Sequence, residues 1–208
     1  MLKINENTPT GIIADSHSKN SLTIEAIHIL KGMGAEEIIH LGDFCDSLLP
    51  EKMDDAVKIM NNYNIQAIMG NNEYIVIKEY LPYHQDYFKE ETISFLSELP
   101  FTIIKSDICF THSTPYNHPA ATRRPLMEYI AILILEKTHQ FRITFRGHSH
   151  SPSLIKINGE SITEWGIESQ TKVSLSKDGI YVITVGAIEN RYCAFFNPID
   201  NQLTSISF

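Results

Sequence analysis

Residues 10–17 read TGIIADSH, an apolar run that ends in an acid and a histidine. The apolar residues predict a buried strand over Thr10–Ala14. Asp15 and His17 then stand where this strand ends and a loop begins. Because sites in open α/β sheets form at the carboxyl ends of strands, we expect both side chains to face a functional site.

The same arrangement, in which polar residues directly follow an apolar strand, occurs four more times. The segments are GDFCD at 42–46, GNNE at 70–73, THS at 111–113 and GHSH at 147–150. Five segments far apart in sequence can therefore meet at one edge of the fold. Their carboxylate, imidazole and amide groups, without thiolate, suit manganese, iron, zinc or similar ions. Gly42, Gly70 and Gly147 permit tight backbone turns beneath such ions.

Helical and extended patterns alternate in the first part of the chain. Apolar spacing predicts helices over 22–33, with Asn20 or Ser21 as N-cap, over 51–62, over most of 74–98 and over 126–139. Further strands are expected at 38–41, 65–69, 101–104, 108–111 and 142–146. Short β runs dominate after residue 151, at 153–157, 161–165, 171–175, 179–185, 192–197 and 202–207. The pattern predicts an α/β fold, with two packed sheets flanked by helices, in a single domain spanning residues 1–208.

Composition excludes several classes of protein. The chain has 208 residues, of which 43% are hydrophobic, enough for a sizeable core. Its net charge of -8 would repel a long nucleic acid, so none is expected as a partner. Three cysteines without paired spacing argue against disulfides, and residues 1–10 lack the apolar core of a signal peptide. The longest apolar run, 129–135, is too short to span a bilayer, so we expect a cytoplasmic protein without a membrane partner.

Taken in order, the five segments resemble the calcineurin-like metallophosphoesterases, whose pattern reads D-x-H, G-D-x-x-D, G-N-H-D/E, H and G-H-x-H. The resemblance extends from residue 11 to about residue 197. The chain looks most similar to the small bacterial and archaeal phosphodiesterase branch that includes the diadenosine-tetraphosphatase-related proteins. This resemblance implies a four-layer α-β-β-α sandwich of two mixed sheets flanked by helices.

The resemblance also implies a role for each polar residue. Asp15, His17 and His150 look like ligands of one metal ion, and Asn71, His112 and His148 look like ligands of a second. Asp43 looks like the carboxylate that bridges them. Two such ions would share a hydroxide that attacks phosphorus in line with the leaving oxygen. The implied catalytic set is Asp43, Asn71, Asn72 and His112; the implied cofactors are two divalent ions, manganese first, with iron, zinc or nickel as alternatives.

Asn72 departs from the family pattern, because many members have a histidine there that protonates the leaving group. An amide can only donate a hydrogen bond, and general acid catalysis is worth about 10²–10⁴-fold. We therefore expect substrates whose leaving group departs unprotonated, such as aryl esters, activated diesters and anhydrides. Phosphodiesters or nucleotide-type phosphates are the leading substrate class. Asn72 and Arg191 are the expected substrate-binding residues, although the family's N-P-G-S turn before that arginine is not reproduced.

Other functions remain open from the sequence. A phosphomonoesterase or protein phosphatase would use the same chemistry, and a non-catalytic protein-binding scaffold could share the fold. The filled ligand positions favour an enzyme, whereas the charge of -8 disfavours an exonuclease. The partner expected is a small phosphoester. The oligomeric state and the natural substrate stay undetermined.

Several polar or aromatic residues have two interpretations each. Asp46 could support the site or cap a helix, and His40 is expected to pack in the core. His118 and the pair Arg123–Arg124 fall in a predicted surface loop, where they would bind a phosphate or face solvent. Trp165, in the hairpin within residues 156–178, would pack on the core or form a lid.

Overall fold

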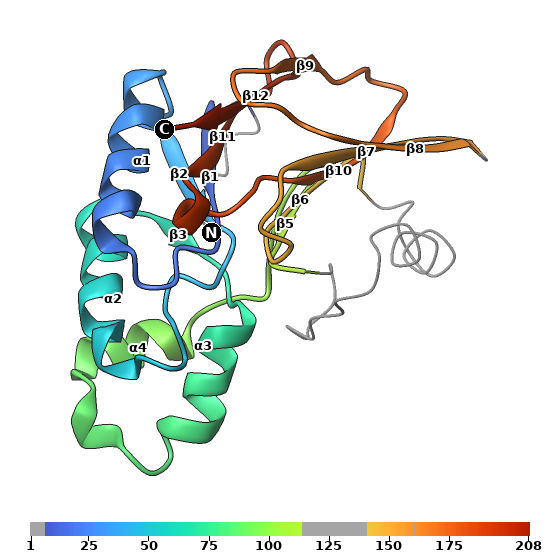
Figure 1. Ribbon diagram of the computed structural model, residues 1–208. Coiled ribbons are helices and arrows are strands. Elements are labelled where there is room, and N and C mark those ends of the chain that lie inside the picture. The colour runs from blue at the N-terminus through green and yellow to red at the C-terminus, as the bar shows by residue number, and fades with distance from the viewer. Residues whose placement is uncertain (1–6, 114–140, 160) are drawn as a thin grey trace.

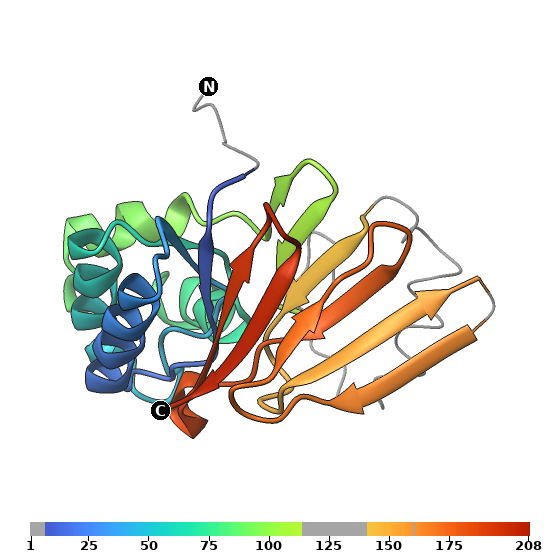
Figure 2. The same ribbon diagram turned by 90° about the horizontal axis from the view of Figure 1, so that it is seen from above.

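The computed structural model describes residues 7–113, 141–159 and 161–208. Two mixed sheets of six strands each, with helices beside them, confirm the predicted α/β class. Figure 1 shows the helices α1, α2 and α4 gathered on one side of the strands. Figure 2, seen from above, shows the strands of both sheets fanning out from this helical layer.

The first sheet contains the strands nearest the helices, in the order β3-β2-β1-β11-β12-β9. Its strands are β1 (Thr10–Ile13), β2 (Glu37–His40), β3 (Gln66–Ala67), β9 (Lys172–Ser174), β11 (Tyr192–Asn197) and β12 (Gln202–Ser207). β1, β2 and β3 run parallel, whereas β11, β12 and β9 join them by antiparallel pairing. The parallel strands therefore bring their carboxyl ends to one edge.

The second sheet has the order β4-β5-β6-β10-β7-β8. Its strands are β4 (Thr102–Lys105), β5 (Ile108–Thr111), β6 (Ile143–Arg146), β7 (Ser153–Asn158), β8 (Ser161–Gly166) and β10 (Ile180–Thr184). The central strands β5, β6 and β10 run parallel, and the outer strands pair antiparallel. All six were expected from the sequence, within a residue or two at each end.

Alternation along the strands separates the core between the sheets from the core under the helices. On β1, Ile12 belongs to the core between the sheets, whereas its neighbour Ile13 belongs to the core under the helices. Between the sheets, the ring of Phe145 lies 5.3 Å from the ring of Phe196 on the opposite sheet, centroid to centroid. Face-to-face packing of this kind fixes the relative position of the two strand edges, from which the polar segments emerge.

The helices cover the outer face of the first sheet. They are α1 (Asn20–Gly32), α2 (Met53–Asn62), α3 (Asn71–Ile75) and α4 (Glu90–Ser97), with the short turns η1 (Pro50–Lys52), η2 (Val76–Tyr80), η3 (Gln85–Tyr87) and η5 (Ile188–Asn190). The predicted helix is present as α1, and its buried residues Thr23, Ala26, Ile27 and Leu30 recur at helical spacing. Within the described ranges, no helix is both long and apolar enough to cross a membrane.

The structure corrects three details of the prediction. α1 begins at Asn20 after Lys19, so neither Asn20 nor Ser21 is its N-cap. The strand expected at 65–69 is reduced to two paired residues, because only this part reaches β2. The helix expected over 74–98 begins earlier, at Asn71, and breaks near Pro82, which lacks a backbone N–H. The helix predicted at 126–139 lies outside the described residues.

Candidate metal centre

The polar segments that follow β1, β2, β3, β5 and β6 lie together. Two groups of side chains each bring one possible ligand atom per residue within 4.8 Å of one another: Asp15, His17 and His150 in the first group, and Asp43, His112 and His148 in the second. Asn71 adjoins the second group, because its Oδ1 lies 3.0 Å from His112 Nε2. The structure thus gathers all seven side chains that sequence patterns singled out.

In the first group, a buried carboxylate oxygen that accepts no hydrogen bond from any residue that the structure describes lies near the imidazole of His150. His150 Nε2 lies 3.4 Å from His17 Nε2 and 3.6 Å from Asp15 Oδ1. Asp15 is fully buried, and its Oδ2 accepts a hydrogen bond of 2.8 Å from the backbone N–H of His148. Its Oδ1 is buried without a hydrogen-bond partner among the described residues. Because a buried oxygen without a donor is costly, a cation between these three residues fits the arrangement.

In the second group, hydrogen bonding fixes which ring nitrogen is available. His112 Nδ1 lies 2.7 Å from the carbonyl oxygen of Leu41, which can only accept, so the ring N–H is at Nδ1. The Nε2 lone pair then faces Asn71 Oδ1 at 3.0 Å and Asp43 Oδ2 at 3.6 Å. Burial lowers the pKa of His112, so ring protonation does not relieve the repulsion between these acceptors. A cation between them would.

Asp43 stands between the two groups. Its Oδ2 lies 3.6 Å from His112 Nε2 and 3.9 Å from His17 Nε2, so one oxygen faces both. Asn72 holds this carboxylate, its backbone N–H donating to Oδ1 at 2.9 Å and its Nδ2 donating to Oδ2 at 2.7 Å. Burial raises the pKa of Asp43, but the two imidazoles and the Asn72 hydrogen bonds outweigh burial and lower it overall.

The negative charges of the Asp15 and Asp43 carboxylates repel each other. Burial, followed by the negative charge of Asp43, raises the pKa of Asp15 well above its usual value. Burial, followed by the neighbouring His112, lowers the pKa of His148 to about 4. The positive charge of Arg146 lowers the pKa of Asp15 but does not offset burial and Asp43, so more positive charge is needed to keep both carboxylates ionised side by side. Divalent cations would supply that charge, which is a second sign that these residues fit a metal centre.

Sequence reasoning missed the structural role of Glu73. Its buried carboxylate accepts three backbone N–H hydrogen bonds, from Gly70 at 2.9 Å, Asp43 at 2.8 Å and Cys45 at 3.0 Å. Burial and the Asp43 charge nevertheless raise the pKa of Glu73 to about 7. Glu73 thus fastens the loop after β2 to the start of α3. Its signal in the sequence is an acid three residues after Gly70, the spacing of a capping box.

The backbone around the centre is strained at the candidate ligands themselves. Asp15, His17, Asp43, His148 and His150 have φ angles of 51°, 41°, 55°, 65° and 58°, in the left-handed region. Such a conformation costs a residue other than glycine roughly 1–2 kcal/mol. Five of seven candidate ligands adopting it indicates that the loops are shaped for a site rather than for folding alone.

Asn72 and Arg191, the expected substrate-binding residues, are both engaged with the protein. Asn72 is 8% exposed; its Nδ2 donates to Asp43, and its Oδ1 accepts the N–H of Ser47 at 2.9 Å. Arg191 Nη2 lies 2.9 Å from Glu25 Oε1 on α1, and its Nε donates to the carbonyl of Phe208. Arg191 is not among the residues that line the cavity over the two groups, so its contact with substrate stays a prediction.

Other residues with two interpretations are placed by their contacts. Asp46 Oδ1 accepts the N–H of Leu48 at 2.9 Å, which is a local turn and not a helix cap. His40 is fully buried with its Nε2 3.0 Å from Ser16 Oγ, which confirms core packing. Trp165 is 39% exposed, so it does not belong to the core. His118, Arg123 and Arg124 lie outside the described residues.

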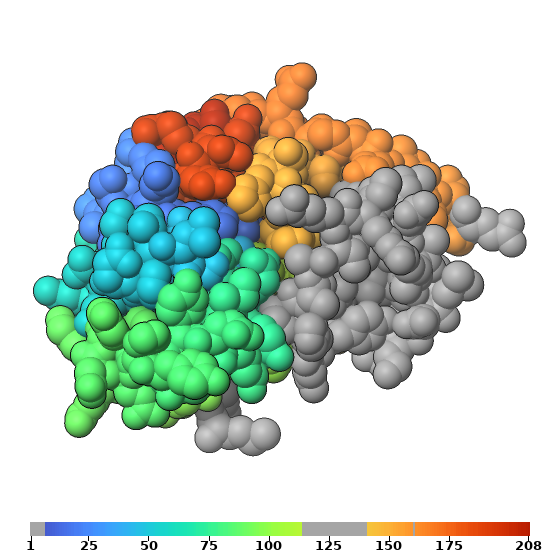
Figure 3. All heavy atoms as spheres, turned by 60° about the horizontal axis from the view of Figure 1, so that its bottom comes forward, coloured from blue at the N-terminus to red at the C-terminus, as the bar shows by residue number. Residues whose placement is uncertain are grey.

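A cavity of about 940 Å³ opens over the two groups. Besides candidate ligands, its lining includes four serines, two acids and two apolar residues: Ser47, Ser149, Ser151, Ser153, Asp46, Glu164, Leu48 and Ile75. Figure 3 shows the face where the cyan segment near residue 50, the teal segment near residue 75 and the yellow segment near residue 150 meet. The cavity is large enough for a small organic phosphate.

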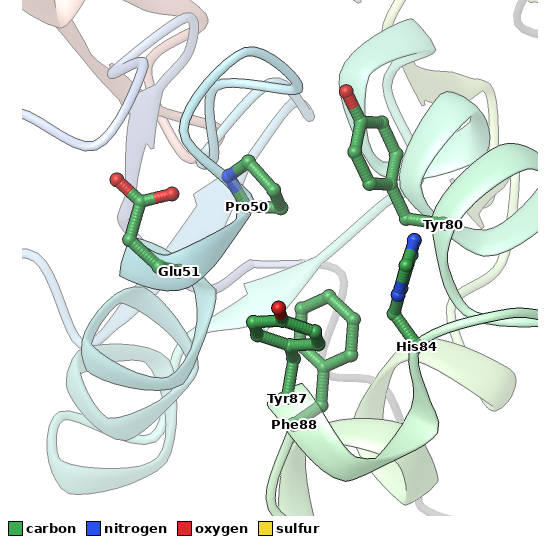
Figure 4. A pocket seen from close by; sticks show the side chains of 6 residues that line it. All are labelled: Pro50, Glu51, Tyr80, His84, Tyr87 and Phe88. Carbon is green, nitrogen blue, oxygen red and sulfur yellow. The ribbon is translucent and has the colours of Figure 1, made fainter.

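A second hollow, of about 200 Å³, lies between η1 and the segment from η2 to α4. Figure 4 shows the rings of Tyr80, His84, Tyr87 and Phe88 on one side of it and Glu51 on the other. The rings of His84 and Tyr87 pack edge to face, with centroids 5.3 Å apart. Its lining contains no member of either candidate metal group, so this hollow is separate from the centre.

Comparison with known proteins identifies the fold. Residues 9–190 match the family model described as the calcineurin-like phosphoesterase superfamily domain. No curated protein sequence matches the chain. Among solved structures, a metallophosphoesterase from Sphaerobacter thermophilus superimposes with a TM-score of 0.75 and 21% identity, covering 96% of this chain and 87% of its own.

Two further solved structures have the same fold. A hypothetical protein from Pyrococcus horikoshii has a TM-score of 0.63 and 14% identity, covering 96% of this chain and 87% of its own. A structure described as a novel archaeal phosphodiesterase has a TM-score of 0.54 and 16% identity, covering 96% of this chain and 99% of its own.

Proposed function

Because this chain belongs to the calcineurin-like phosphoesterase superfamily, we propose that it hydrolyses phosphodiesters or nucleotide-type phosphates, with two divalent metal ions at the candidate centre. The observation that carries the proposal is the Asp43 carboxylate, whose Oδ2 faces both groups of side chains at 3.6 and 3.9 Å. We further propose a cytoplasmic location, which agrees with the three cysteines being free.

In this proposal, seven side chains hold the ions. Asp15, His17 and His150 would bind one ion, Asn71, His112 and His148 the other, and Asp43 both. Two cations held by these residues would supply activated water at neutral pH and positive charge for the phosphoryl oxygens. Manganese is the ion we propose, with iron, zinc or nickel as alternatives, since imidazole and carboxylate ligands suit each of them.

The protein itself holds the ligand side chains in place and limits which leaving groups the centre can handle. Asn72 holds the Asp43 carboxylate through two hydrogen bonds. The side-chain carboxylate of Glu73 holds the same loop by accepting the backbone N–H of Asp43. Asn72 cannot pass a proton to a leaving group, because an amide has no acidic proton to give near neutral pH. Substrates whose leaving oxygen departs as a stable anion therefore suit this centre best.

Charges in the cavity lining favour diesters over monoesters. A phosphodiester carries one negative charge, whereas a monoester carries close to two at neutral pH. Asp46 and Glu164 both line the cavity and repel the additional charge. For charges about 8 Å apart in partly aqueous surroundings, each carboxylate disfavours the second charge by about 0.5–1 kcal/mol. That repulsion corresponds to roughly a 2–6-fold effect for each carboxylate.

The test compares a bis-aryl phosphate with a mono-aryl phosphate, using chain reconstituted with Mn²⁺. We expect a higher kcat/KM for the diester, and Glu164→Gln should raise the monoester rate relative to the diester rate about 2–6-fold. Glu168→Gln changes a nearby exposed carboxylate outside the cavity lining and serves as the control. A faster monoester reaction would reassign the chain as a phosphomonoesterase. Full metal loading without turnover of either compound would make it a scaffold.

A further inference from the structure

Glu189 contacts the ring of His150 at Nδ1, the nitrogen on the side away from the candidate centre. Its Oε1 lies 2.8 Å from His150 Nδ1, and the two side chains are 28% and 33% exposed. Glu189 lies on η5, the short turn after β10, and none of the five polar segments contains it. The contact thus joins a candidate ligand to a residue outside the motifs.

This contact determines which nitrogen of His150 faces the centre. An ionised carboxylate only accepts hydrogen bonds, so His150 carries its proton on Nδ1 and donates it to Glu189. The lone pair is then on Nε2, the nitrogen that lies 3.4 Å from His17 Nε2 and 3.6 Å from Asp15 Oδ1. A carboxylate behind a ligating imidazole fixes its orientation and increases its basicity.

The backbone of η5 strengthens the same connection. The N–H of Ile188 donates to the carbonyl of Ala14 at 2.8 Å, and the N–H of Glu189 reaches the carbonyl of Asp15 at 3.3 Å. The turn that carries Glu189 is therefore attached to the loop that carries Asp15. Glu189 therefore contacts two of the three residues of the first group: the His150 ring through its side chain, and the backbone of Asp15 through its own backbone.

The second group is oriented differently. His112 donates its Nδ1–H to the carbonyl of Leu41, a neutral backbone acceptor in the buried interior. A change at Glu189 leaves that hydrogen bond untouched. The rings of His150 and His112, one from each group, are therefore oriented by different hydrogen-bond acceptors.

From these contacts we infer that Glu189 is a positioning residue that sets the metal affinity of the Asp15–His17–His150 site separately from its neighbour. The inference rests on the proposed function, since it requires that site to bind a cation. Removing a carboxylate of this kind weakens metal binding about 10–100-fold. The site of Asp43, Asn71, His112 and His148 should keep its affinity.

The test is a calorimetric titration of the metal-stripped full chain with Mn²⁺. The variants are Glu189→Ala, Glu189→Gln and the control Glu25→Ala, which removes a half-exposed carboxylate that pairs with Arg191 beside η5. We expect two binding events in the unchanged chain and in the control. In Glu189→Ala one event should weaken about 10–100-fold, and in Glu189→Gln, which retains an oxygen acceptor without the charge, it should weaken less.

Two outcomes would overturn the inference. One is that Glu189→Ala binds both ions as tightly as the control does, and the other is that both sites weaken equally. Failure of the unchanged chain to bind Mn²⁺ would instead refute the proposed function. The titration of the unchanged chain alone shows this result, so the two failures can be told apart. As an independent measurement, ¹⁵N spectra of the metal-free protein should show His150 protonated at Nδ1, and Glu189→Ala should shift that proton toward Nε2.

Discussion

Replacing Gly70 with alanine should separate the two loops on which the centre depends. A Cβ at this position would lie 2.2 Å from Asp43 Oδ1, 2.3 Å from the backbone nitrogen of Asp43 and 2.8 Å from Glu73 Oε2. Non-bonded heavy atoms need roughly 3.5 Å, so the loops must move apart by roughly 1 Å. Overpacking of this kind costs about 1–3 kcal/mol, and each weakened hydrogen bond to a buried charge costs about 1.5–3 kcal/mol.

Together these losses predict that Gly70→Ala lowers the free energy of unfolding by about 4 kcal/mol. For a chain of 208 residues this corresponds to a fall in Tm of roughly 8–16 °C. Asp43 would also leave its position between the two groups, so binding of both ions should weaken.

Urea denaturation of the metal-free protein, followed by titration with Mn²⁺, measures both effects. Gly32→Ala is the control, because a Cβ there meets no atom within 4 Å at the end of α1. We expect the control to match or slightly exceed the original stability. If Gly70→Ala were as stable and as metal-competent as Gly32→Ala, the close approach of the two loops could not be what holds Asp43.

Three further predictions concern other parts of the centre and the core beneath it. Asn72→His supplies a proton donor, so the rate for alkyl relative to aryl phosphate esters should rise; an unchanged ratio in a metal-loaded variant would remove this side chain from the leaving-group step. Burial lowers the pKa of His40 to about 3 from 6.5, so the unfolded chain binds the extra proton. The free energy of unfolding, measured in urea, should therefore be highest above pH 6.5 and fall by roughly 1.4 kcal/mol for each pH unit toward pH 3. His40→Gln should flatten that slope, and equal slopes in the two proteins would contradict the prediction. Because burial and the charge of Asp43 raise the pKa of Asp15, protons compete with metal there, so Mn²⁺ affinity should increase as the pH rises, and a flat profile would argue against Asp15 as a ligand.

The sequence predicted the strands and the clustering of the polar side chains, because both depend on local patterns. Apolar runs bounded by polar segments locate β1, β2, β5 and β6, and parallel strands bring the polar residues at their carboxyl ends to one edge. His148 and His150 illustrate this: their place in the fold is set by the strand that precedes them. The resemblance to a known family then supplied roles that spacing alone does not give.

Contacts between residues distant in sequence were not predictable. Glu73 reaches the backbone of Asp43, and Glu189 reaches His150, only because loops from separate strands meet. Arg191 matches the pattern of a phosphate contact, yet the pairing with Glu25 depends on how α1 packs against η5. These residues carry no periodic signal, since their roles arise from tertiary geometry.

The ion content of the purified chain tests the central claim most directly. Metal analysis after saturation with Mn²⁺ and removal of the excess should give two ions per chain, and Asp43→Asn should lose both, because that carboxylate faces both groups. A chain that holds no Mn²⁺, or an Asp43→Asn variant that still holds two ions with unchanged affinity, would contradict the account.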